Sequence, residues 1–227
     1  ALPIYSLVLS QETAKEAFTS CIGHSIRESM YPIIEDIKVF LTYPQTMRSI
    51  MICGPHKSGK HHLLRCIMQY LKIDTEQLLH IDCAAIALGK LTISDIMQRI
   101  DTSLDQEKSN IILFENLDAL TELPASITTM ETLLRFYQRM AESNELNLLF
   151  LAVTAMNEHF LQLQKLFQKV YELPDLNSRT LKEKYEFVLH FMQNEADAIG
   201  KTISLSSSIL NCFATACYPG NLQYLKQ

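Results

Sequence analysis

Short apolar runs that alternate with helical stretches constrain the fold of this chain of 227 residues more than any other feature. Five such runs lie at 49–53, 78–82, 111–114, 148–153 and 170–173. The third is continuously hydrophobic, as expected for a strand of a parallel sheet that is covered on both faces. Helical periodicity is found between the runs, at 60–70, 94–100, 126–140 and 159–166. The alternation predicts βαβ units and a three-layer α/β fold with a parallel sheet.

The pattern changes after Pro174, where only helices are predicted. They cover 178–199, 206–216 and a last stretch from residue 219, and another helix is predicted near the start, at 25–40. Ser178 is a suitable N-cap and Gly200 a suitable residue to close a helix. We therefore expect an α/β core over residues 1–175, followed by a small all-helical lid over residues 176–227.

Composition narrows the class of protein. Hydrophobic residues make up 48% of the chain and charged residues 20%, which indicates a buried core. The net charge of −5 argues against a general affinity for nucleic acid. No apolar run reaches the roughly 18 residues that a membrane span needs. Residues 1–4 lack a basic segment and an initiator Met, so the chain is interpreted as a fragment of a longer one.

Cysteine usage indicates a reducing compartment, and hence a cytoplasmic protein. There is no CxxC pair and no Cys/His spacing typical of zinc sites. Most of the cysteines lie in apolar runs, where cysteine usually behaves as a small buried hydrophobe. The six are Cys21, Cys53, Cys66, Cys83, Cys212 and Cys217.

The strongest local motif follows the first apolar run and precedes a helix. It matches GxxxxGK and consists of Gly54, Pro55, His56, Lys57, Ser58, Gly59, Lys60 and His61. Glycines let a backbone wrap around a phosphate, and the helix that follows offers unpaired N–H groups. Lys60 is expected to reach the β- and γ-phosphates, and Lys57 adds a second charge. The motif predicts binding of ATP or ADP.

His61 stands where this motif normally has Ser or Thr. That hydroxyl would coordinate Mg²⁺, a hard cation that prefers oxygen, so we expect Mg²⁺ to be bound weakly or not at all. The neighbouring His61 and His62 allow two interpretations, a transition-metal site or a polar helix start in solvent. The second is favoured because no third ligand is apparent in the sequence.

An ordered series of motifs resembles the AAA+ superfamily of ATPases. It comprises the phosphate loop, an acidic strand end, a polar residue after the fourth strand, the step at Leu173 and Pro174, and the lid residues 219–222. The resemblance implies a Walker B strand at 111–116, with Glu115 as a Mg²⁺ ligand and Asn116 in place of the catalytic base. Asn116 cannot accept a proton. In the alternative register Glu115 is the base and Phe114 takes the metal position.

Other roles that the resemblance implies are also altered. Thr154 and Asn157 are the candidates to sense the γ-phosphate, although Asn157 could equally be a helix cap. The run that should hold an arginine finger has only Lys165 and Lys169. Gln223 stands where the second sensor normally has arginine. The segment 84–91 has no aromatic residue of the kind that grips threaded polypeptides.

A narrower resemblance concerns the phosphate loop together with residues 169–179. These two runs resemble the IQ-and-AAA-domain family of the axonemal nexin–dynein regulatory complex, whose Walker B region is also degenerate. The resemblance implies a structural role in the ciliary cytoskeleton, with other protein subunits as partners. The IQ segment of that family is not present in this chain.

Three functional hypotheses remain. The altered catalytic positions favour a scaffolding module that binds nucleotide and hydrolyses it poorly or not at all. The alternative is an active ATPase that works in an oligomer, with the arginine supplied in trans by another subunit. An oligomeric ring of this chain is doubtful, because its own arginine-finger run has no arginine. A P-loop kinase ranks last, because Arg179 is the sole arginine after Pro174.

Overall fold

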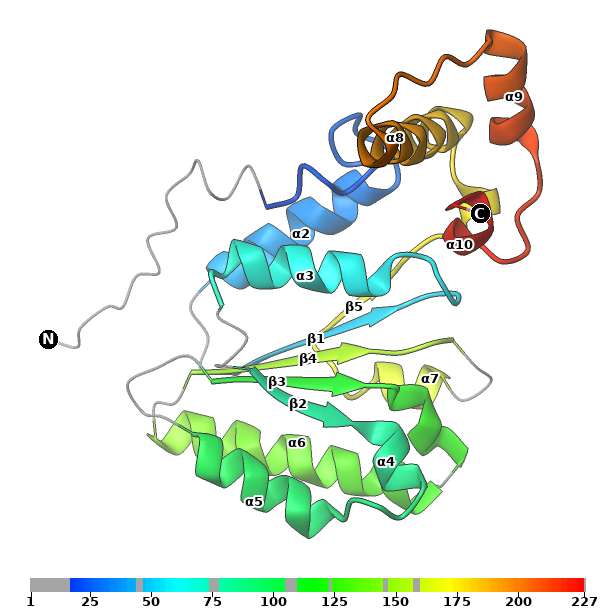
Figure 1. Ribbon diagram of the computed structural model, residues 1–227. Helices are drawn as coiled ribbons and strands as arrows, with labels where there is room; N and C mark the ends of the chain where they lie inside the picture. Colours follow the sequence, from blue (N-terminus) through cyan, green and yellow to red (C-terminus); the bar gives the residue numbers. More distant parts are fainter. Residues whose placement is uncertain are drawn as a thin grey trace, which may run out of the picture. The chain divides into compact units, whose positions relative to one another are not determined.

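A five-stranded parallel sheet forms the centre of the α/β fold, as predicted (Figure 1). The computed structural model describes residues 17–43, 47–73, 78–104, 110–122, 124–144, 147–156 and 160–226. The strand order is β2-β3-β4-β1-β5, and every neighbouring pair runs parallel. The strands are β1 (Met47–Cys53), β2 (Leu78–Asp82), β3 (Asn110–Glu115), β4 (Leu148–Val153) and β5 (Lys169–Glu172). All six residues of β4 are buried, in agreement with its continuous hydrophobicity.

The register of the strands brings their carboxyl ends to one edge of the sheet. Glu115 of β3 is paired with Asp82 of β2 on one side and with Val153 of β4 on the other. Val153 is in turn paired with Ile52 of β1. The polar residues that end or directly follow these strands therefore gather at this edge.

The described residues form two compact units. The sheet unit contains residues 43–54 and 72–172 and holds all five strands. The helical unit contains the described residues up to 42, residues 55–71, and those from 173 onward. This grouping differs from a linear division at residue 175, which stays a prediction.

The sheet unit buries its core between the strands and two long helices, α5 (Ile93–Ser103) and α6 (Pro124–Asn144). Phe150 of β4 lies 5.9 Å from Phe114 and 6.2 Å from Tyr137, measured between ring centroids. Thr92 caps α5 in a reciprocal capping box with Asp95, which fixes where that helix begins. The shorter helices are α4 (Cys83–Ala87), the 3-10 helix η2 (Leu117–Glu122) and α7 (Phe160–Gln164).

The helical unit contains α2 (Met30–Thr42), α3 (Lys60–Tyr70), η3 (Leu176–Ser178), α8 (Leu181–Ile199), α9 (Ser207–Thr215) and α10 (Leu222–Lys226). The bounds predicted for α3 are confirmed. The predicted N-cap of α8, Ser178, is wrong, because Thr180 and Glu183 form the capping box there. Gly200 closes α8 in the left-handed conformation, with φ of 63°, as predicted.

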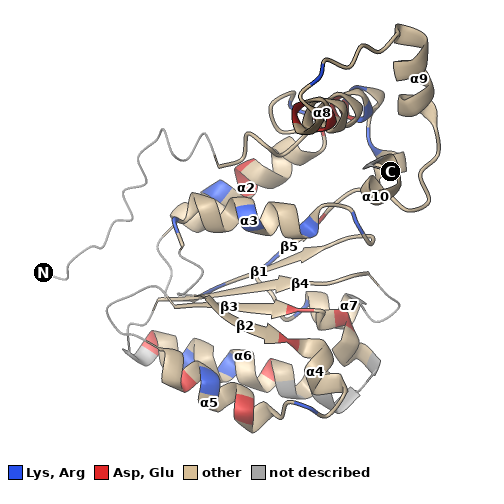
Figure 2. Cartoon of the chain, in the orientation of Figure 1, with Lys and Arg blue, Asp and Glu red and all other residues tan. Residues whose placement is uncertain are grey.

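Charged side chains of both signs are interspersed along α6 and α8 (Figure 2). On α6, Arg135 and Glu131 form an ion pair one turn apart, with 2.6 Å between the guanidinium and carboxylate atoms. Within the described part of the chain, none of the helices combines the length and the apolar character needed to span a membrane.

Candidate functional site

The phosphate loop leaves β1 at Gly54 and enters α3 at Lys60. Three of its residues have a positive φ, namely Gly54 (144°), Lys57 (59°) and Gly59 (101°). Gly59 is required for its backbone conformation rather than for space, since among the described residues an added Cβ would meet the Leu222 side chain at 3.7 Å, an ordinary van der Waals contact. The alternation of left- and right-handed residues is the geometry by which a loop turns its N–H groups towards an anion.

Hydrogen bonds within the loop converge on one carbonyl. The Nζ of Lys60 donates to the backbone oxygen of Pro55 at 2.7 Å, and the N–H of Ser58 donates to the same oxygen at 3.3 Å. Lys60 is only 7% exposed, so its ammonium is held inside the loop. The hydroxyl of Ser58 is buried and has no hydrogen-bond partner among the described residues.

The amino end of α3 follows a glycine. Gly59 is its N-cap and supplies no side-chain hydrogen bond, and the first turn holds no acidic residue. The positive end of the helix dipole therefore lies beside the loop, where it favours a negative charge. His61 is exposed in this first turn, and His56 and Lys57 are exposed in the loop.

At the carboxyl edge of the sheet, the predicted Walker B residues are bonded to neighbours within the sheet unit. The Oε2 of Glu115 lies 2.7 Å from the Nε2 of His80. The amide of Asn116 donates to the Oδ1 of Asp82 at 2.9 Å, and the same carboxylate oxygen accepts from the N–H of Ala84 at 3.0 Å. Asn116 has a φ of 53°, a conformation that Asn tolerates.

Thr154, the predicted sensor after β4, is buried and bonded to a carboxylate that the sequence reasoning missed. Its hydroxyl lies 3.1 Å from the Oδ1 of Asp118, which also accepts from the N–H of Ala155 at 3.1 Å. Asp118 lies in η2, three residues after Glu115. Its position close behind an acidic strand end was the one sequence signal that could have singled it out.

The remaining predicted positions that the structure describes lie on different elements. Asn157 lies outside the described residues. Gln223 is exposed on α10, and Lys165 is exposed in the turn after α7. Lys169 is half-buried at the start of β5. The roles predicted for these four residues stay predictions.

The lid turn before α10 is fixed by a buried asparagine. Asn221 is 2% exposed, accepts from the N–H of Leu176 at 3.0 Å and donates to the Oδ2 of Asp175 at 3.0 Å. Asn177 adds two bonds to Tyr218, one to its N–H at 2.8 Å and one to its carbonyl at 3.1 Å. The segment after Pro174 and the residues before α10 are thus joined within the helical unit.

Arg179 is held in the interior of the helical unit. It is 6% exposed, its guanidinium lies 3.4 Å from the carboxylate of Glu183, and it stacks over the ring of Phe187 at 5.1 Å. Burial lowers the pKa of Arg179, because desolvation disfavours its charged form. This arginine therefore serves an internal ion pair.

A group of two cysteines and a histidine was also missed by the sequence reasoning. The thiol of Cys21 donates to the sulfur of Cys66 at 3.5 Å, and the Nε2 of His62 lies 3.8 Å from that sulfur. The hydrogen bond from Cys21 lowers the pKa of Cys66 to about 4 and raises the pKa of Cys21. The bond to Cys66 raises the pKa of His62.

The five parallel strands, their order and the loop after β1 give the chain an α/β fold with a phosphate-loop motif, and AAA+/P-loop ATPases of known structure share this fold. No family model matches the sequence, and no curated protein sequence matches it. The fold is therefore compared with solved structures alone.

Three solved structures have a fold similar to that of this chain. NtrX from Brucella abortus in complex with ADP is 15% identical, with a TM-score of 0.60 over 95% of this chain and 51% of that chain. RuvB of Thermotoga maritima is 12% identical, with a TM-score of 0.58 over 87% and 59%. PCH-2 of C. elegans is 15% identical, with a TM-score of 0.53 over 87% and 54%. The chain thus spans little more than half of each of these proteins, and the likeness concerns the fold alone.

Proposed function

We propose that the chain binds ATP or ADP through the loop at 54–61 and hydrolyses it poorly or not at all, as a structural module of a larger assembly. The observation that carries the binding part is the loop itself. Its left-handed residues, the lysine held inside it and the uncapped helix that follows are the features that a phosphate requires. NtrX, a structural neighbour, has been solved with ADP and with ATP.

The proposed lack of hydrolysis rests on the carboxyl edge of the sheet. Asn116 occupies the position of the base and donates its amide to Asp82, while Glu115 is engaged with His80. Removing a general base typically costs about 10²–10⁴ in rate, and removing an arginine finger about 10³–10⁵. Both losses together would leave turnover negligible.

The Mg²⁺ requirement is expected to be weak. His61 replaces the hydroxyl that would bind the metal, and Glu115 is the acidic residue proposed to hold it. Because His80 lies 2.7 Å from the Oε2 of Glu115, a metal ion would compete with this hydrogen bond for that oxygen. The nucleotide affinity should therefore differ little with and without Mg²⁺.

Calorimetric titration with ATP and ADP, followed by steady-state hydrolysis on the same sample, tests the proposal. Lys60→Ala should weaken binding at least about tenfold, since a charge-assisted hydrogen bond is typically worth about 1.5–3 kcal/mol. Lys90→Ala, in the exposed turn after α4, removes an equal charge and is the matched control. Circular dichroism of both variants checks that the fold is retained.

Three outcomes separate the hypotheses. Binding without turnover, lost in Lys60→Ala and kept in Lys90→Ala, supports the proposal. Turnover at ordinary ATPase rates would favour the alternative of an active ATPase that works in an oligomer. An undiminished affinity in Lys60→Ala would show that the loop is not the nucleotide site.

The resemblance to the IQ-and-AAA-domain family extends the proposal to a scaffold of the ciliary axoneme. This extension rests on the two sequence runs quoted above and on no structural finding. Localisation of the tagged full-length protein tests it. A signal away from the axoneme in ciliated cells would refute the assignment and leave the nucleotide proposal untouched.

A further inference from the structure

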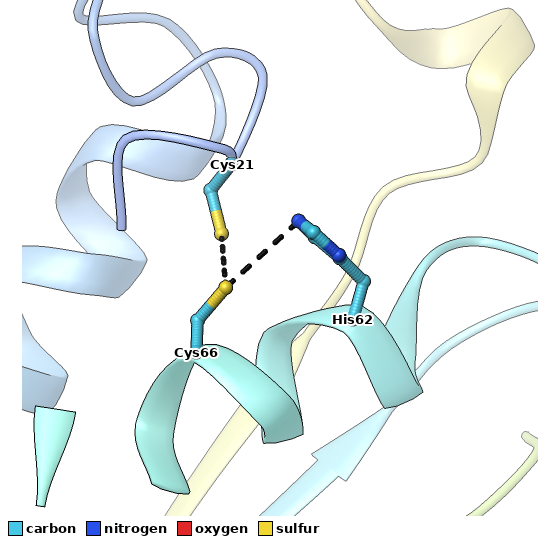
Figure 3. A group of neighbouring side chains, drawn as sticks. All are labelled: Cys21, His62 and Cys66. Carbon is cyan, nitrogen blue, oxygen red and sulfur yellow. Dashed lines mark hydrogen bonds between the residues drawn. The ribbon is translucent and has the colours of Figure 1, made fainter. Parts of the chain in front are cut away.

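Cys21, His62 and Cys66 form a compact group within the helical unit (Figure 3). Their ligand atoms all lie within 4.8 Å of one another. Both cysteines are 3% exposed, and His62 is half-buried. Thiolates and an imidazole at this proximity are the ligands that a thiolate-binding metal requires.

Two of the three come from one face of α3. His62 and Cys66 are four residues apart, and this spacing places side chains one above the other on a helix. The third comes from the segment before α2, which is anchored beside α3. Phe18 packs on Tyr70 with 5.5 Å between ring centroids. The carbonyl of Ser20 lies 3.1 Å from the Nε2 of His62, a hydrogen bond that this nitrogen gives up when it binds a metal.

Two of the three distances between the ligand atoms match those of a tetrahedral zinc site. Zn–S bonds of about 2.3 Å and Zn–N bonds of about 2.0–2.1 Å place two sulfurs about 3.8 Å apart, and a sulfur and a nitrogen about 3.6 Å apart. Here Cys21 and Cys66 are separated by 3.5 Å, and Cys66 and His62 by 3.8 Å. These two distances need shifts of only a few tenths of an ångström. The third pair, Cys21 and His62, lies within 4.8 Å, and its two atoms would have to approach on binding the ion.

We propose that Cys21, His62 and Cys66 bind Zn²⁺. Two thiolates balance the charge of the ion, and each thiol releases its proton on binding. A cavity of about 220 Å³ adjoins the group and is lined by Cys21 and His62. It gives room for a water molecule in the fourth position. The objection from the sequence, that the adjacent histidines have no third ligand, no longer applies to His62.

The rival interpretation is a disulfide between Cys21 and Cys66. The two sulfurs are 3.5 Å apart, whereas a disulfide requires about 2.05 Å. An experiment can distinguish the two interpretations, because a disulfide between Cys21 and Cys66 leaves no thiolate to bind the metal. Neither depends on nucleotide binding, so the proposal stands or falls independently of the proposed function.

The experiment is a titration of the reduced 227-residue protein with Zn²⁺ against a chromophoric zinc indicator, and with Co²⁺ as a spectroscopic probe. We expect one Zn²⁺ per chain. We also expect Co²⁺ to give visible bands of tetrahedral coordination and a sulfur-to-cobalt charge-transfer band in the ultraviolet. The cobalt spectrum of the unaltered protein needs no variant, so it remains informative if a variant fails to fold.

Variants locate the site. Cys66→Ser, Cys21→Ser and His62→Gln should each weaken Zn²⁺ binding more than about 100-fold, since loss of supporting groups alone costs about 10–100-fold. The matched controls, Cys212→Ser and His61→Gln, alter an exposed cysteine and the exposed neighbouring histidine and should leave the affinity unchanged.

Three results would overturn the proposal. The first is no Zn²⁺ uptake by the reduced protein, and the second is a cobalt spectrum without the sulfur charge-transfer band. The third is binding that survives Cys66→Ser but is lost in Cys212→Ser. If mass spectrometry of protein handled without added reductant shows Cys21 joined to Cys66, and the reduced form takes up no metal, the pair is a redox element instead.

Discussion

Replacement of Arg179 by methionine would leave a carboxylate unpaired in the interior of the helical unit. Glu183 is fully buried, and its carboxylate accepts hydrogen bonds from three donors. These are the guanidinium of Arg179 at 3.4 Å, the hydroxyl of Ser29 at 2.5 Å and the N–H of Thr180 at 3.2 Å. The substitution keeps much of the aliphatic volume that packs on Phe187 and removes the positive charge.

The expected loss in the free energy of unfolding follows from this burial. Removal of one partner of a buried ion pair costs about 3–5 kcal/mol, because the remaining charge is uncompensated. Ser29 and Thr180 still donate to Glu183 in the variant, so we expect the lower end, about 3 kcal/mol. The double variant Arg179→Met, Glu183→Gln should recover much of the loss, since it removes the second charge and keeps an oxygen that can accept from Ser29.

Urea denaturation measures the effect. With a slope of about 1–3 kcal/mol per molar urea, the midpoint of Arg179→Met should fall by at least about 1 M. Arg135→Met on α6 is the matched control, since Arg135 pairs with Glu131 at the same spacing but is 69% exposed. We expect it to cost less than about 0.5 kcal/mol. A loss in Arg179→Met no larger than in the control would refute the reasoning.

Two further predictions concern other charged groups. Hydrogen bonds from His24, and to a lesser extent from Lys38, lower the pKa of Glu35. Its contribution to the free energy of unfolding should therefore be fully present above pH 4.5, the ordinary pKa, and be lost as the pH falls through the lowered pKa. Glu35→Gln should therefore destabilise at neutral pH, by less than about 1 kcal/mol because the side chain is 43% exposed, and be neutral in strong acid. Urea midpoints at both pH values check this, and a deficit that grows in acid would contradict it. Asn116→Asp should lower the free energy of unfolding, since the Asn116 amide lies 2.9 Å from Asp82 and the substitution sets a second carboxylate there. We expect no ATP hydrolysis in this variant, and turnover detected in a hydrolysis assay would contradict this.

Much of the fold could be predicted because its signals are local. The apolar runs gave the five strands, and the bounds of α3 and β4 match the expectation. The phosphate loop was found where a strand meets a helix, and Gly200 closes α8 as its backbone freedom suggested. Hydrophobic period and glycine positions are properties of neighbouring residues, so they are visible without any tertiary contact.

The first residue of a helix was harder to predict, because several neighbouring polar residues are each suitable as its N-cap. Ser178 and Thr180 are both suitable N-caps, and the sequence alone did not decide between them. Glu183 settles the choice, since its carboxylate reaches the backbone of Thr180 while its other oxygen meets Ser29, 154 residues away. A distant contact thus fixed a local boundary.

The composition of the sites was decided by tertiary structure alone. Cys21 and Cys66 are 45 residues apart, and Asp118 and Thr154 are 36 apart. No spacing rule connects such pairs, because their approach depends on how the strands are ordered and on which helix face is buried. The sequence therefore determined the class of fold and the place of the phosphate loop. Only the folded chain could show that His62 has two sulfur neighbours and that the acidic groups at the sheet edge are already bonded to residues beside them.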